Sequence, residues 1–224
     1  MWLSRFFRFA GGLLVVNFLW VVVSRVWEGK AEELAWLSHV GTLAGGVGLL
    51  LRSDYLVSLA LVSLFLFHGI WIVDGTAWLL TGTFPLGAVY YLAEHNWFQF
   101  LATIHHFYVL PLLLAWLFWR RRLHPQAWVG ASALFAVLVL FSAFFLPTGP
   151  NVNSAHAVWP GVDRTFFGHA NRLPKVIYVP ALILASAFAN FWLVNRLLEL
   201  LVRLINHRHS GQQHPPPATS AKSR

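Results

Sequence analysis

The chain has 224 residues, of which 58% are hydrophobic and only 11% are charged. Ordinary soluble domains are about 45–50% apolar and about 25% charged, so this composition excludes a soluble enzyme. Cysteine is absent, which removes disulfides, thiolate metal ligands and cysteine nucleophiles. The formal net charge of +8 comes from residues at helix ends and in the C-terminal tail, so we interpret it as a sign of membrane topology rather than of nucleic-acid binding.

The pattern of apolar runs predicts an all-α, polytopic membrane helix bundle. A run of about 18 or more apolar residues is long enough to cross the hydrocarbon layer of ~30 Å as a helix. The predicted spans are 9–26, 34–51, 55–75, 97–119, 126–146 and 176–204. We therefore expect residues 1–205 to form one transmembrane domain of a multi-pass protein of the cell membrane, followed by a disordered polar tail at 206–224.

A seventh span is conceivable at residues 76–93, which are apolar but contain Gly82, Pro85 and Gly87. Short cytoplasmic loops carry an excess of Lys and Arg, and six spans with both termini inside place about eleven of the 16 on the inner side. Seven spans give a weaker asymmetry, so we favour six. Residues 76–93 are then an outer re-entrant or interfacial segment.

Polar side chains inside the spans are the first candidates for a functional site, because each is costly in a membrane unless it has a partner. His39 and Thr42 lie three residues apart on one face of the second helix, followed by three glycines. Thr42 either bonds back to a carbonyl one turn earlier while the glycines allow close packing, or presents its hydroxyl to a cavity beside His39.

The third helix carries His68 near its middle and Asp74 near its outer end. An imidazole at this depth needs a hydrogen-bond partner from another helix. Asp74 is interpreted either as a solvated interfacial residue or as part of the site.

The fourth helix contains the sharpest local signal, the adjacent pair His105 and His106. Adjacent helical residues diverge by about 100°, so only one imidazole is expected to point squarely into the bundle. Thr42, His39 and at least one of the pair lie at matching depths and are predicted to share a cavity in the outer half of the membrane, with His68 nearby. The alternative is that both histidines only tie helices together.

The polar interval 147–175 is interpreted either as a cap over a lipid headgroup, through Asn153, His156 and Arg172, or as a wet connector. It contains no metal-type spacing such as HExxH, and no metal, other cofactor or nucleic-acid partner is predicted. The candidate substrate-binding residues are His39, His68, Asp74, Asn153, His156 and Arg172.

The order of these features resembles the YwaF-like family of bacterial integral membrane proteins. The resemblance covers about residues 34–200 and rests on LAWLSHVGTLAGGVGLLLR, a histidine-containing third helix, FQFLATIHHFYVLPLLLAWLFWRR and TGPNVNSAHAVWPG. That family is similar to a eukaryotic transmembrane acyltransferase and, more distantly, to androgen-induced hydrolases of fatty acid esters of hydroxy fatty acids. The resemblance implies acyl chemistry on a membrane lipid.

Particular residues carry this implication. A motif like L-H-L-C opens helix two in the family; here His39 matches the histidine, but Gly41 stands at the cysteine position, which excludes a cysteine acyl-enzyme. The distant hydrolases use a threonine in an early helix and a histidine in a later one. The resemblance therefore implies Thr42 as nucleophile and His105 or His106 as base.

Two classes of function remain open from the sequence. The first is an intramembrane lipid acyl hydrolase or acyltransferase that uses a Thr/His pair, with a membrane lipid as its substrate. The second is a non-catalytic membrane protein whose bundle histidines bind a lipid or a b-type haem, since no c-type attachment motif is present.

Overall fold

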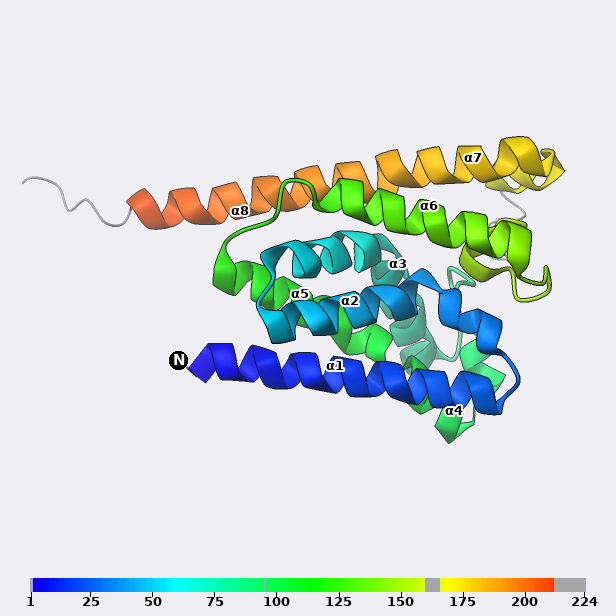
Figure 1. Ribbon diagram of the computed structural model, residues 1–224, viewed down its shortest axis with the longest axis horizontal. Helices are drawn as coiled ribbons and strands as arrows, with labels where there is room; N and C mark the ends of the chain where they lie inside the picture. Colours follow the sequence, from blue (N-terminus) through cyan, green and yellow to red (C-terminus); the bar gives the residue numbers. More distant parts are fainter. Residues whose placement is uncertain (1, 95, 160–165, 212–224) are drawn as a thin grey trace, which may run out of the picture.

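The computed structural model describes residues 2–94, 96–159 and 166–211, and this part of the chain folds as helices, turns and loops without any strand (Figure 1). The predicted all-α architecture is confirmed. The α-helices are α1 (Trp2–Trp27), α2 (Leu37–Leu51), α3 (Asp54–Thr81), α4 (Trp97–Thr103), α5 (His105–Arg120), α6 (Ala127–Phe145), α7 (Lys175–Ala185) and α8 (Leu193–Gly211).

Shorter helical pieces connect these elements. Single 3₁₀ turns occupy Ala31–Ala35, Tyr90–Glu94, Val152–Ser154 and Phe166–Arg172, and a π-helical stretch, Ser186–Trp192, joins α7 to α8. Each of the six predicted spans corresponds to one helix or to two or three consecutive helical elements.

Among the described residues, five continuous helical stretches are long and apolar enough to cross a membrane: Trp2–Trp27, Asp54–Thr81, Trp97–Arg120, Ala127–Phe145 and Lys175–His207. α2 is apolar as well but has only 15 residues, or about 22 Å at 1.5 Å per residue. The bundle therefore contains six apolar helical segments.

Residues 76–93 do not form a separate spanning helix. α3 continues past its predicted end at residue 75 as far as Thr81, and Gly82 then ends it with a φ of 72°. Glycine has no Cβ atom and adopts this left-handed angle at little cost, which makes it a common helix end. The chain then folds back at the end of the bundle and reaches α4 through the turn Tyr90–Glu94.

α2 lies at the centre of the bundle because its glycines let neighbouring backbones approach. A Cβ atom on Gly11 of α1 would lie 2.7 Å from the carbonyl oxygen of Gly46, and a Cβ on Gly48 would lie 2.9 Å from the backbone nitrogen of Val57 in α3. The prediction that these glycines allow close helix packing is confirmed. Small residues are favoured in such contacts within membranes because they let backbones meet.

α6 and the long α7–α8 rod form a second layer over this core, as Figure 1 shows along its upper edge. α8 continues to Gly211, so the predicted tail at 206–224 begins as helix rather than as disordered chain. Residues 212–224 of that prediction lie outside the described residues.

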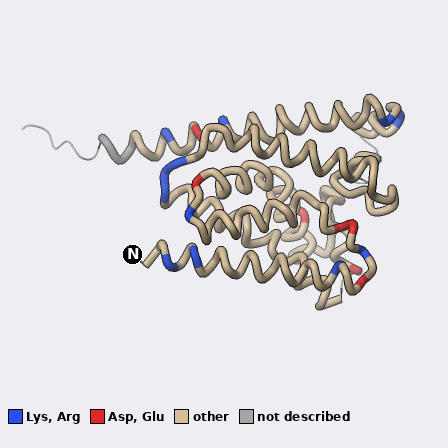
Figure 2. The backbone as a smooth tube through the Cα atoms, in the orientation of Figure 1, with Lys and Arg blue, Asp and Glu red and all other residues tan. Residues whose placement is uncertain are grey.

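Lys and Arg are concentrated at both ends of the helices (Figure 2). One end combines the start of α1 with Arg5 and Arg8, the end of α2 with Arg52, and the end of α5 with Arg120 and Arg121. This is the end that the charge count predicts to face the cytoplasm.

Candidate functional site

Four histidine side chains come together in the core of the bundle, and we call them the histidine cluster. His39 lies on α2, His68 on α3, and His105 and His106 begin α5. All four are buried, and His68 and His105 have 0% of their surface exposed. They meet because α2, α3 and α5 pack against one another.

The imidazole rings are in contact with each other. The ring centres of His105 and His106 are 4.1 Å apart, and those of His68 and His106 are 4.6 Å apart. His105 lies 5.9 Å from His68 and 5.7 Å from His39. The structure thus brings together all four histidines that the sequence analysis singled out.

Backbone carbonyls fix the orientation of three of these rings. Nδ1 of His105 lies 2.9 Å from the carbonyl oxygen of Ala102, and Nδ1 of His106 lies 2.8 Å from that of Thr103. His39 makes the same kind of contact, 2.9 Å from Nδ1 to the Glu33 carbonyl. A carbonyl only accepts hydrogen bonds, so each Nδ1 carries the proton and, in the neutral ring, Nε2 keeps its lone pair.

Three nitrogen atoms of the cluster are buried without a hydrogen-bond partner: Nε2 of His105 and both ring nitrogens of His68. The expectation that His68 would find a partner from another helix is therefore wrong, because rings rather than hydrogen-bonding groups surround it. A buried polar atom without a partner costs about 1–3 kcal/mol, so this arrangement calls for an explanation beyond packing.

The break between α4 and α5 presents both imidazoles of the pair to the core. Ile104 separates the two helices, and His39 flanks His105 while His68 and Trp71 flank His106. The prediction that only one of the two would face the bundle is wrong. The side chains do diverge, but neighbouring helices pack on both sides of α5.

Trp71 is a member of the site that the sequence analysis missed. Its ring stacks on His106 with centres 4.7 Å apart and an interplanar angle of 15°, and its Nε1–H donates to the hydroxyl of Tyr91 at 2.9 Å. Trp71 follows His68 by three residues on one helical face, and this spacing is a signal that could have identified it.

Asp74 anchors the segment that follows α3. The carboxylate is 0% exposed and accepts hydrogen bonds from the backbone N–H groups of Leu86 at 2.8 Å, Ala88 at 2.8 Å and Val89 at 3.0 Å. The interpretation of Asp74 as a solvated interfacial residue is wrong, because the chain folds back over it. Both of its oxygens are occupied by these backbone bonds.

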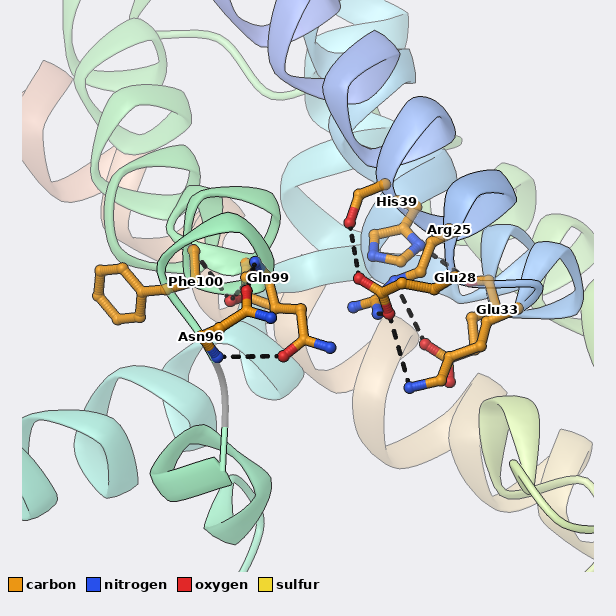
Figure 3. A network of polar contacts seen from close by, with 10 residues as sticks. Arg25, Glu28, Glu33, His39, Asn96, Gln99 and Phe100 are labelled. Atoms are coloured by element: carbon orange, nitrogen blue, oxygen red, sulfur yellow. Dashed lines mark hydrogen bonds and ion pairs between the residues drawn. The ribbon is translucent and has the colours of Figure 1, made fainter.

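A charged network lies beside His39 at the end of α1 (Figure 3). Arg25 pairs with Glu28 at 3.1 Å and with Glu33 at 3.2 Å, and the hydroxyl of Ser24 donates to Glu28 at 3.1 Å. These bonds hold the turn that supplies the Glu33 carbonyl to His39. The sequence analysis missed this network, although Arg25 and Glu28 have the spacing of a helical ion pair.

The two carboxylates of the network respond to it differently. Burial raises the pKa of Glu28, but the Ser24 hydrogen bond and the Arg25 charge outweigh burial, so the pKa lies below its usual value. For Glu33 burial dominates and raises the pKa above its usual value, although Arg25 and Lys30 oppose the shift. Glu33 is therefore the carboxylate of this pair that takes up a proton more readily.

Thr42 lies further along α2 than His39. Its hydroxyl donates to the carbonyl of Ser38 at 2.7 Å, the back-bond that the sequence analysis gave as one alternative. Three residues separate it from His39, or about 4.5 Å along the helix axis. Gly45, one turn further, faces Leu113 of α5, which places Thr42 level with the stretch of α5 after the histidine pair.

The loop residues predicted to cap a headgroup differ in burial and in bonding. Asn153 is buried; its Oδ1 accepts from the N–H of Leu37 and its amide donates to the carbonyl of Ala35, both at 2.8 Å. Arg172 is exposed, and His156 is partly buried. Burial lowers the pKa of His156 below its usual value, and the neighbouring Lys175 charge adds to this effect.

An open apolar groove lies on the surface of the bundle, between α1 and the α4–α5 region. Ile104, the residue directly before His105, is part of its wall. The lining residues are Leu13, Val16, Asn17, Trp20, Leu101, Ile104 and Tyr108.

Comparison with known proteins gives no match for this chain among protein-family models, curated proteins or solved structures. The resemblance noted from the sequence therefore stays a prediction, and the site has to be interpreted from its own chemistry.

Proposed function

We propose that this chain is a multi-pass protein of the cell membrane that hydrolyses or transfers the acyl group of a lipid ester, with the histidine cluster activating the nucleophile. The observation that carries the proposal is His105. Its Nδ1–H is held by the Ala102 carbonyl, and its Nε2 is buried without a partner. A general base needs this combination of a fixed tautomer and a free lone pair.

The surroundings of His105 support a lipid as the substrate. The apolar groove reaches the neighbouring residue, Ile104, and its walls consist mainly of aliphatic and aromatic side chains. A groove on the surface of spanning helices faces acyl chains rather than water. A lipid lying there would hold its ester near the start of α5, next to the residue that precedes His105.

Thr42 is the proposed nucleophile, but its hydroxyl has to change its hydrogen bonding before it can react. Its hydroxyl donates to Ser38 and lies about one turn further along α2 than His39, so catalysis requires that it leave this bond and turn toward α5. A threonine hydroxyl attacks an ester only when a base removes its proton. The proposal therefore predicts that the Thr42 hydroxyl reacts only when His105 is present.

The test is labelling with a fluorophosphonate probe and turnover of a fluorogenic long-chain ester, both on the protein in lipid nanodiscs. Thr42→Ala and His105→Ala should each lose labelling and turnover, whereas Thr42→Ser keeps the hydroxyl and should retain part of both. Ser132→Ala is the matched control, because the Ser132 hydroxyl makes the same back-bond, to Trp128 at 2.7 Å.

Two results would contradict the proposal. One is turnover in Thr42→Ala and His105→Ala equal to that of Ser132→Ala. The other is a Soret band in the absorbance of the purified wild-type protein, which would assign the histidines to haem.

A further inference from the structure

We propose that His68, His105 and His106 form a binding site for a single transition-metal ion, with Zn²⁺ as the expected occupant. This inference does not depend on the acyl chemistry proposed above. It starts from their positions: one nitrogen atom from each residue lies within 4.8 Å of the other two.

The separations require only a small closure around an ion. Zinc binds imidazole nitrogen at about 2.0–2.1 Å, which places tetrahedral ligands about 3.3 Å from one another. The widest pair in the cluster therefore has to close by at most about 1.5 Å, a distance that side-chain rotation covers. His105 and His106 come from one helix and His68 from another, so an ion would also fasten α3 to α5.

The hydrogen bonds around the cluster match those of metal-binding histidines. Such residues donate the ring N–H that faces away from the ion to a carbonyl or carboxylate, which fixes the ring and directs the other nitrogen at the metal. His105 and His106 donate Nδ1–H to the carbonyls of Ala102 and Thr103 in this way. Two of the three proposed ligands are thus oriented in advance.

The unpartnered nitrogens give an independent reason for a ligand. Nε2 of His105 and both nitrogens of His68 are buried without any hydrogen-bond partner. Asp74 shows the contrast, since three backbone N–H groups occupy its carboxylate. A bound ion would accept the Nε2 lone pair of His105 and a lone pair of His68, which no hydrogen bond uses. With an ion bound there, Nε2 of His105 would not act as the base proposed above, so the two uses of this nitrogen exclude each other.

The donor set selects the class of metal. Three imidazoles and no oxygen ligand exclude Mg²⁺ and Ca²⁺, which bind oxygen, and favour a borderline metal such as Zn²⁺. Three neutral ligands leave the two positive charges of the ion uncompensated in a medium of low dielectric constant. The open fourth position therefore favours an anionic ligand, such as hydroxide or a carboxylate.

Metal analysis of the full chain tests the proposal directly. The protein, produced without a polyhistidine tag, is stripped with a chelator in detergent, dialysed against Zn²⁺ and analysed by mass spectrometry for metal content. We expect one zinc per chain in the wild type and none retained in His68→Asn, His105→Asn or His106→Asn. Asparagine keeps a polar side chain of similar size but is a poor zinc ligand.

Two control variants separate this site from other histidines. His169 is exposed, so His169→Asn should bind zinc as the wild type does. A triple variant of His207, His209 and His214 removes the histidines near the C-terminus, where weak zinc binding is also conceivable, and should likewise retain one ion. Zinc that disappears in the triple variant but persists in His68→Asn would overturn the proposal.

Cobalt provides a spectroscopic readout that does not require the metal to stay bound during purification. Co²⁺ in a site with three imidazole ligands gives visible d–d absorption, and excess Zn²⁺ should abolish it by displacement. Co²⁺-loaded protein without such bands, or with bands unchanged in His68→Asn, would contradict a site in the cluster. Since binding is measured without a substrate, failed ester turnover leaves this result unaffected, and absent zinc leaves the ester assay interpretable.

Discussion

Asp74 and His68 lie on the same helix, six residues apart, and both have 0% of their surface exposed, yet their surroundings are opposite. Asp74 accepts three backbone hydrogen bonds from the segment that folds over it. His68 has no partner for either ring nitrogen and touches other imidazoles instead. Burial alone therefore does not identify a functional residue in this bundle.

The difference distinguishes buried polar groups that stabilise the fold from buried polar groups that serve a function. A buried charge whose hydrogen bonds are all made holds a segment in place, because losing it leaves several donors without an acceptor. A buried imidazole without a partner reduces stability and is understandable when a proton or an ion uses it. Replacing a residue of the first kind should mainly lower stability, and replacing a residue of the second kind should mainly impair function.

The largest expected effect is at Asp74. Asp74→Ala leaves the N–H groups of Leu86, Ala88 and Val89 without an acceptor and should cost about 3 kcal/mol or more of the free energy of unfolding. Asp74→Asn keeps one acceptor oxygen and should lose less. Unfolding in mixed micelles titrated with a denaturing detergent measures both. A loss below about 1 kcal/mol for the alanine variant would show that the Asp74 hydrogen bonds contribute little to stability.

Asn153 should show a smaller effect of the same kind. Asn153→Ala removes the contacts to Leu37 and Ala35 that tie the outer loop to the start of α2, and we expect a loss of about 2 kcal/mol in the same unfolding experiment. Arg172→Ala, at an exposed position of the same loop, should stay within about 0.5 kcal/mol. Equal losses in both variants would restore the interpretation of these residues as one headgroup cap.

His68 should behave in the opposite way. His68→Leu replaces an imidazole without hydrogen bonds by an apolar side chain of similar size, so in the presence of a chelator the unfolding free energy should be unchanged or higher by about 1 kcal/mol. His68→Leu should nevertheless no longer retain zinc. If this variant loses about 3 kcal/mol under metal-free conditions, His68 has a packing role comparable to that of Asp74.

The smallest effect is expected where a charged pair lies near the surface. Arg120 bonds to both carboxylate oxygens of Asp54 at 3.1 and 3.0 Å, but the two side chains remain 37% and 22% exposed. Asp54→Asn should cost less than about 1 kcal/mol, and added salt should reduce the difference from wild type. A salt-independent loss of more than about 2 kcal/mol would show that burial is not what separates this pair from Asp74.

Much of the architecture could be predicted from the sequence, because apolar length determines which segments span. The helices lie where the apolar runs of the sequence are, and the glycines of α2 mark the close contact with α1. Helix ends were less predictable: Asp74, Gly75 and Thr76 look like the end of a span, but α3 continues to Thr81. The segment that follows α3 folds back and hydrogen-bonds to Asp74, and no local signal in the sequence encodes this contact.

For the candidate site, the sequence by itself determined which polar residues occur within the apolar helices, among them four histidines, Thr42 and Asp74. Only the tertiary structure decided which of them have partners. Asp74 is bonded through a segment that begins twelve residues later, Thr42 is bonded within its own helix, and His68 meets imidazoles from α5. The reason is physical: a polar group has a free lone pair only if no donor from any element reaches it, and that depends on how helices distant in sequence pack together.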